Sequence, residues 1–143
     1  MRVFDTGVLL KLYLPEPRAT EAIQLVNGSG NKPPFTKLHA LEMRSALRQK
    51  AGRGEISATE CQKLLMSMEN DLAAGVFEVR AVSWPDVFDR AETLSAAHGV
   101  ATLCRRFETL HVALAVEQHA TEFYTFDHRQ SLMATAAGLR IVP

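Results

Sequence analysis

The sequence has few of the features that mark specialised classes of protein. It contains two cysteines, Cys61 and Cys104, and neither has a second cysteine or a histidine at zinc-finger spacing. We therefore expect two reduced thiols and a cytoplasmic protein. No signal peptide is visible, and no apolar run approaches the roughly 20 residues of a membrane helix, so no membrane association is expected.

The chain also lacks an excess of charge of either sign, with 16 basic and 16 acidic side chains. A nucleic-acid-binding protein is usually basic overall, so any contact with RNA would have to come from local basic groups. No Ser/His/Asp or Cys/His arrangement indicates a side-chain nucleophile. No glycine-rich phosphate loop follows the first predicted strand, which argues against a flavodoxin-like binding domain, although an unrelated α/β binding domain stays an alternative.

What is present predicts a single domain over residues 1–143, since 47% of the residues are hydrophobic and can form a core. Strands are predicted at 2–5, 34–36, 76–82, 123–126 and 140–142. Helices are predicted at 6–13, 16–27, 38–51, from the capping box at 57–60, at 83–98 with a stop at Gly99, at 107–116, and from Asp127 to Gly138. Alternation of strands and helices predicts an α/β fold with a mostly parallel central sheet flanked by helices. We expect strands 2–5 and 123–126 to lie side by side and parallel.

Four acidic residues stand out against this pattern. Asp5 and Asp127 end predicted strands, where ligands gather in open α/β sheets. Glu42 lies between Leu41 and Met43 in a predicted helix, and Glu108 begins the apolar helix. Carboxylates that converge on one cleft repel one another, which raises at least one pKa, and Mg²⁺ or Mn²⁺ would remove that repulsion. Such an ion suits hydrolysis of a phosphodiester by activated water.

Each acid also has an ordinary structural explanation. Asp5 and Asp127 could cap the helices that follow them, because Asp is a favoured N-cap residue. Glu42 and Glu108 could be solvated groups or salt-bridge partners, for instance of Arg105 or Arg106. Thr6 could position a water or ligand beside Asp5, and His111, on a buried helix, is expected to be a hydrogen-bonded core residue.

Several short motifs resemble, in the same order, those of the PIN-domain family. They are FDT at 4–6 followed by VLLKLYLPE at 8–16, LEMR at 41–44, FETLHVALA at 107–115, TFDHR at 125–129 and GLRIV at 138–142. The resemblance covers essentially the whole chain. It implies a sheet flanked by helices, a cluster of acids that binds magnesium or manganese, and endoribonuclease activity. A stand-alone chain of this size is similar to VapC toxins, which implies a homodimer neutralised by a cognate antitoxin protein.

The resemblance places Asp5, Glu42, Glu108 and Asp127 at the metal. Two positions depart from the family pattern, because the third acid is usually Asp where this chain has Glu108, and Gly7 replaces a residue that is often Ser or Asn. If these departures spoil the site, a PIN fold that binds RNA or a partner without cutting it is the alternative. Paired Glu-x-x-His spacings, at His39/Glu42 and Glu108/His111, also suggest a di-iron bundle, but strand patterns at both chain ends argue against four long helices.

Overall fold

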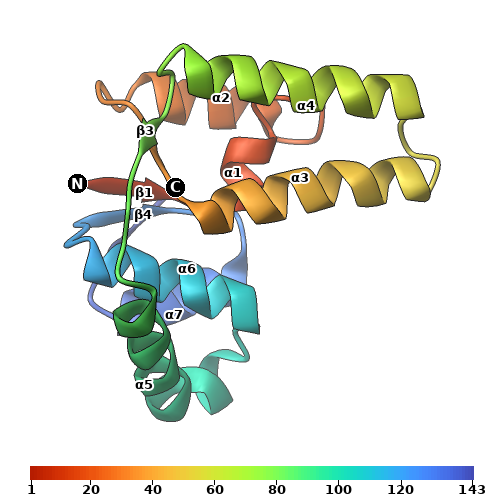
Figure 1. Cartoon of the computed structure of the whole chain (residues 1–143). Helices are drawn as coiled ribbons and strands as arrows, with labels where there is room; N and C mark the ends of the chain where they lie inside the picture. Colours follow the sequence, from red (N-terminus) through yellow and green to blue (C-terminus); the bar gives the residue numbers. More distant parts are fainter. The chain divides into compact units, whose positions relative to one another are not determined.

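The computed structural model describes residues Met1–Pro143 and shows a mixed α/β chain (Figure 1). Its strands are β1 (Arg2–Phe4), β2 (Pro34–Phe35), β3 (Glu78–Val79), β4 (Glu122–Tyr124) and β5 (Arg140–Val142). Its helices are α1 (Thr6–Leu10), α2 (Ala19–Asn27), α3 (Lys37–Gly52), α4 (Ala58–Ala73), α5 (Trp84–Thr102), α6 (Arg106–Glu117) and α7 (His128–Ala136). No helix is both long enough and apolar enough to cross a membrane.

The chain divides into two compact units, which we describe separately. Unit 1 joins Met1–Val8 to Ala81–Pro143, and unit 2 is Leu9–Arg80. The prediction of one domain over residues 1–143 stays a prediction. Unit 1 holds three of the four acids selected from the sequence, together with Thr6, whereas Glu42 belongs to unit 2.

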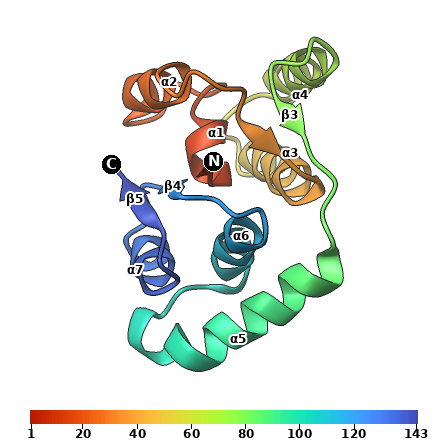
Figure 2. The ribbon, with the colours of Figure 1, turned by 90° about the vertical axis from the view of Figure 1, so that its left-hand side faces the viewer.

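A three-stranded parallel sheet, in the order β1-β4-β5, organises unit 1. Phe4 lies opposite Tyr124 in the register of β1 with β4, so the predicted parallel neighbours are confirmed. Both views show α6 and α7 against one face of this sheet, with α5 packed on their outer side (Figure 2). The run from Thr109 to Ala115 in α6 is buried all round, as its apolar sequence predicts.

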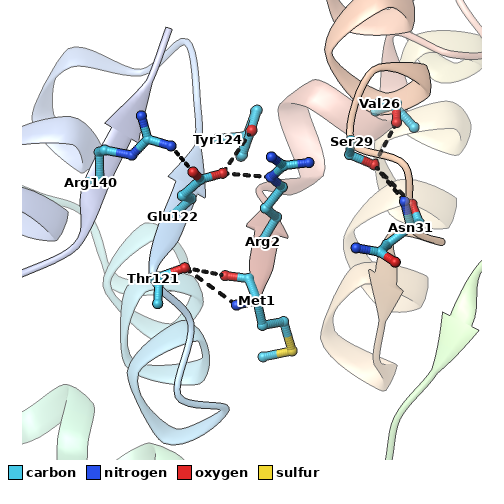
Figure 3. Close-up of polar contacts among 9 residues, drawn as sticks. All are labelled: Met1, Arg2, Val26, Ser29, Asn31, Thr121, Glu122, Tyr124 and Arg140. Atoms are coloured by element: carbon cyan, nitrogen blue, oxygen red, sulfur yellow. Dashed lines mark hydrogen bonds and ion pairs between the residues drawn. The ribbon is translucent and has the colours of Figure 1, made fainter.

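One buried carboxylate ties the three strands of unit 1 together at their amino-terminal end. Glu122 on the central strand accepts a hydrogen bond from Arg2 Nε at 2.6 Å and from the Tyr124 hydroxyl at 3.0 Å, and it also pairs with Arg140 (Figure 3). Glu122 is 7% exposed, and a buried charge is tolerated only when it is paired and hydrogen-bonded. The cluster lies at the opposite end of the strands from Asp5 and Asp127.

Unit 2 is built from α2, the helices α3 and α4, and the short parallel pair β2–β3. The predicted capping box begins α4, since the Ser57 and Glu60 side chains each accept a hydrogen bond from the other's backbone N–H. Tyr13 donates to Asp71 Oδ2 at 2.6 Å, which joins the segment after α1 to α4. Ser29 stabilises the loop after α2, because its hydroxyl lies 2.7 Å from the Val26 carbonyl and 2.8 Å from the Asn31 carbonyl and can donate to either one (Figure 3).

Several element boundaries differ from those predicted. The strand expected at 76–82 is reduced to Glu78–Val79 because its partner β2 offers only two residues. The helix expected at 16–27 begins at Ala19, and α1 ends at Leu10 rather than at 13. Helix α5 continues past Gly99 to Thr102, and the next residue, Leu103, has a left-handed backbone with φ of 52°.

Candidate active site at the carboxyl edge of the unit 1 sheet

The candidate site lies where β1 and β4 end side by side. The Asp5 backbone N–H donates to the Tyr124 carbonyl at 3.0 Å, so the ladder between the strands extends to Asp5. Thr125 and Asp127 follow β4 at the same edge. The register of two parallel strands therefore brings together residues from the beginning and the end of the sequence.

Asp5 is a buried carboxylate with two hydrogen-bond donors. Its Oδ1 accepts from the Val8 backbone N–H at 2.7 Å, which caps α1, and its Oδ2 accepts from the Thr125 hydroxyl at 2.5 Å. Burial raises the pKa of Asp5, and the negative charge of Asp127 raises it further. The two hydrogen bonds and the charge of His111 oppose that rise without cancelling it. The predicted raised pKa is confirmed, and burial is its main cause.

Thr125 connects Asp5 to the amide of Gln130. The Thr125 Oγ1 lies 2.6 Å from Gln130 Oε1, while Gln130 Nε2 donates to the backbone carbonyl of Glu108 at 3.2 Å. The Thr125 hydroxyl has one hydrogen and cannot donate to both Asp5 Oδ2 and Gln130 Oε1. When Asp5 is ionised, one of these two acceptors therefore lacks a hydrogen from Thr125. A proton on Asp5 completes the chain of hydrogen bonds, since Asp5 then donates to Thr125 and Thr125 donates to Gln130.

Asp127 caps α7, as the structural explanation from the sequence anticipated. Its Oδ1 accepts from the Gln130 backbone N–H at 2.8 Å, and its own N–H donates to Thr125 Oγ1 at 3.0 Å. Its second oxygen, Oδ2, lies 3.8 Å from Arg105 Nη2. Asp127 therefore uses Oδ1 to cap α7, while Oδ2 faces the Arg105 guanidinium.

Glu108 is held by an arginine in the first turn of α6. Arg105 Nη2 lies 2.5 Å from Glu108 Oε1, and the same nitrogen faces Asp127. The salt bridge expected as an alternative for Glu108 is therefore present, with Arg105 and not Arg106 as its partner. One guanidinium links the two carboxylates, although its side chain is 68% exposed.

Thr6, the residue after Asp5, forms a buried pair with His111 of α6. Thr6 Oγ1 lies 2.9 Å from His111 Nε2, and both side chains are buried. The expectation that His111 is a hydrogen-bonded core residue is confirmed. The role of Thr6 in positioning a water or ligand stays a prediction.

Gly7 borders the Asp5 carboxylate. A Cβ atom built at Gly7 would lie 3.4 Å from Asp5 Oδ1, at the near edge of ordinary van der Waals contact. A side chain at this position would therefore lie against the carboxylate.

Glu42 lies in α3 of unit 2, half-buried between the exposed Leu41 and the fully buried Met43. Because α3 belongs to the other unit, the contribution of Glu42 to the acidic site stays a prediction. Near it in sequence, Arg44 pairs with Glu69, while Lys37 and Arg48 make no ion pair.

No three histidine, cysteine, aspartate or glutamate side chains are arranged to hold a metal ion. The donors in unit 1 are nonetheless carboxylate oxygens, which suit Mg²⁺ or Mn²⁺. Arg105 pairs with Glu108 and faces Asp127, while the Asp5 carboxylate accepts hydrogen bonds from Val8 and Thr125.

Two members of this network, Thr125 and Gln130, were not predicted from the sequence. Gln130 follows Asp127 by three positions, the spacing that an N-cap residue makes with the backbone it caps. Thr125 has no comparable signal, because its role depends on the alignment of two strands whose residues are 120 positions apart.

A comparison with models of known protein families matched none of them, and a search of curated proteins returned no relative.

Proposed function

We propose that this chain is a metal-dependent endoribonuclease with a PIN-like fold, the toxin of a toxin–antitoxin pair. The observation that carries the proposal is the buried Asp5 carboxylate directly after β1, with Asp127 three residues beyond the end of the neighbouring parallel strand β4. Burial of a carboxylate beside a second negative charge costs free energy, and such costs are typical of functional sites.

The residues that would hold a divalent cation are Asp5, Asp127 and Glu108, with Glu42 as the fourth acid that the family resemblance implies. Bound there, magnesium or manganese would lower the pKa of a water molecule and offset the negative charge of a phosphate. The chain itself does the positioning. Capping of α1 and α7 fixes Oδ1 of both aspartates, and the Thr125 hydroxyl fixes Oδ2 of Asp5.

Proton occupancy at Asp5 would control the activity. Because the pKa of Asp5 is raised, Asp5 stays protonated at pH values just above the usual titration range of aspartate, where an ordinary aspartate has already lost its proton. A neutral carboxyl is a poor ligand, so cleavage should increase as the pH rises through the pKa of Asp5.

The experiment is cleavage of total cellular RNA by the purified chain with manganese, with and without a chelator. We expect cleavage that the chelator stops and that Asp5→Asn and Asp127→Asn abolish, since each removes a ligand charge at nearly constant volume. Asp89→Asn, which removes an exposed carboxylate from α5, is the matched control and should cleave normally. Cleavage that persists in Asp5→Asn or in excess chelator would contradict the mechanism.

A second candidate function is a PIN-like protein that binds RNA or a partner without cutting. The pairing of Arg105 with both Glu108 and Asp127 favours it, because the arginine supplies the positive charge that a metal would otherwise provide. Manganese binding without cleavage of any RNA tested would support this candidate. The homodimer and the antitoxin partner belong to the proposal and follow from the family resemblance alone. The cytoplasmic location also belongs to the proposal and follows from the cysteine pattern of the sequence.

A further inference from the structure

A hollow of about 220 Å³ opens between α5 and the beginning of α6 in unit 1. One face of α5 forms one wall, with residues at the helical spacing i, i+4 and i+7, and the opposite wall comes from the α5–α6 connection and α6. The polar and aromatic lining residues are Phe88, Glu92, Ser95, Cys104, Arg106 and Thr109. Sites for whole drug-sized ligands span about 300–1,000 Å³, so this hollow suits one flat ring system and not a whole nucleotide.

Two phenylalanine rings near the hollow are unusually exposed. Phe88 is 57% exposed, and Phe107, in the first turn of α6, is 50% exposed. Phe107 lines an adjoining hollow together with Cys104, Arg105 and Arg106. Exposed aromatic faces beside cationic side chains are the usual platform for bases of single-stranded nucleic acid.

The polar groups of the hollow include both an acceptor and a donor. Arg106 makes no ion pair and can donate hydrogen bonds through its guanidinium, and the Glu92 carboxylate can accept them. Guanine is the base that uses both groups best, because N1–H and the N2 amino group donate while O6 and N7 accept. Adenine offers a carboxylate only the donor N6–H, whereas guanine offers the two neighbouring donors N1–H and N2–H to its two oxygens.

The hollow shares Cys104 and Arg106 with the adjoining hollow, and the adjoining hollow is next to the acids through Arg105. This residue lines the adjoining hollow and also contacts Glu108 and Asp127. Glu108 and Asp127 act electrostatically on the Cys104 thiol, which lines both hollows. A base in the hollow would therefore place the neighbouring phosphate of the same strand beside the acids.

We propose that this hollow, the α5–α6 pocket, binds an unpaired guanine of an RNA strand, with Phe88 or Phe107 stacking on the ring and Glu92 and Arg106 recognising its edge. The proposal rests on the proposed function and names its substrate class, single-stranded RNA that carries a guanosine next to the cleaved phosphate. Paired bases are excluded, because the edge that Glu92 reads is used in the duplex.

The test measures binding without cleavage, so that it does not depend on metal chemistry. Short fluorescent uridine oligomers that carry one guanosine or one adenosine are titrated with the whole chain in chelator, and anisotropy reports binding. We expect about a 10-fold preference for the guanosine oligomer. Glu92→Gln should remove most of the preference, and Phe88→Ala with Phe107→Ala should weaken binding by about 5-fold or more.

Two substitutions on the same helix serve as matched controls. Asp89→Asn removes a carboxylate that does not line the pocket, and Val100→Ala shortens an apolar side chain that is 91% exposed. Both variants should bind as the unmodified chain does. Equal affinity for the two oligomers, or a preference unchanged in Glu92→Gln, would overturn the proposal.

A second readout follows the Cys104 thiol inside the pocket. Guanosine oligomer should slow alkylation of Cys104, with Cys61, which is 6% exposed, as the internal reference. Alkylation of Cys104 at the same rate with and without saturating oligomer would place the base elsewhere and overturn the proposal. Self-association that Phe88→Ala with Phe107→Ala abolishes would identify the pocket as a protein interface, which also overturns it. Metal-dependent cleavage by the unmodified chain tests the proposed function separately.

Discussion

Asp5 is a residue whose ionised form lowers the stability of the fold while its carboxylate is available for the proposed reaction. Its carboxyl group is buried, its pKa is raised, and its two donors do not fully offset the loss of water. A group whose pKa is higher in the folded state stabilises the fold below its unfolded pKa, and this contribution is lost as the pH rises through the folded pKa. For Asp5 the loss begins above its ordinary value of 3.8.

Asp5→Asn should therefore stabilise the chain at neutral pH, by about 1 kcal/mol. The amide oxygen can still accept from the Val8 N–H, while the amide NH₂ can donate to Thr125 and free its hydroxyl for Gln130. Urea unfolding of both chains at several pH values measures the difference, which should disappear below about pH 4. A variant that is less stable at every pH would show that the carboxylate is favourable in the fold.

Arg105 is the second residue whose replacement is informative. Arg105→Gln removes the cation between Glu108 and Asp127, so manganese should bind about two- to fivefold more tightly, the range expected for an exposed ion pair. Isothermal titration measures this affinity. Arg106→Gln removes the adjacent arginine, which makes no ion pair, and should leave manganese affinity unchanged. Equal effects in both variants would mean that net charge, and not the local pairing, controls binding.

At the scale of single elements, α5 ends in a strained position. Leu103 adopts left-handed backbone angles with φ of 52°, a region that glycine occupies without steric cost. Leu103→Gly should raise the free energy of unfolding by about 0.5–1 kcal/mol. Val100→Gly, three residues earlier in the helix, should lower it by about 1 kcal/mol. Thermal unfolding compares them, and a loss of stability in both would show that the Leu103 side chain contributes more than its backbone strain costs.

The sequence predicted best those helix ends that depend on hydrogen bonds between residues close together in the sequence. Ser57 and Glu60 form the expected capping box. Ser83 and Asp86 have the spacing of a capping box at the start of α5, but Ser83 makes no side-chain cap hydrogen bond, and Asp86 is one methylene shorter than the glutamate that completes such a box. Gly99 does not end α5, because a glycine inside a helix costs only about 1 kcal/mol and packing against α6 can offset it.

The candidate site was partly predictable because two of its acids belong to a local sequence pattern. An acid at the end of each of two apolar strands is a local pattern, and parallel pairing converts it into proximity, as Asp5 and Asp127 demonstrate. The Thr125–Gln130 link could not be predicted, because it requires the register of strands far apart in sequence. Glu108 could be assigned either to a metal or to an arginine, and only the folded structure reveals the pairing with Arg105.

At the scale of the whole molecule, Glu122 joins the three strands of the unit 1 sheet. Glu122→Gln removes the charge that Arg2 and Arg140 share, so the free energy of unfolding should fall by about 1–3 kcal/mol. Glu117→Gln breaks the more exposed pair with Arg90 and should cost less than about 0.5 kcal/mol. Urea unfolding compares the two, and equal losses would show that burial adds nothing to the Glu122 cluster.

The order of the strands along the chain has a consequence for synthesis on the ribosome. Strand β1 is made first, yet its partner β4 begins at Glu122, so β1 waits unpaired while the whole of unit 2 is made. At about 5–20 residues per second, that wait lasts on the order of 10 s. Asp5 has no Thr125 or Asp127 beside it during this time. If the chain cuts RNA as proposed, a nascent chain is harmless to the ribosome that makes it until that last segment has emerged.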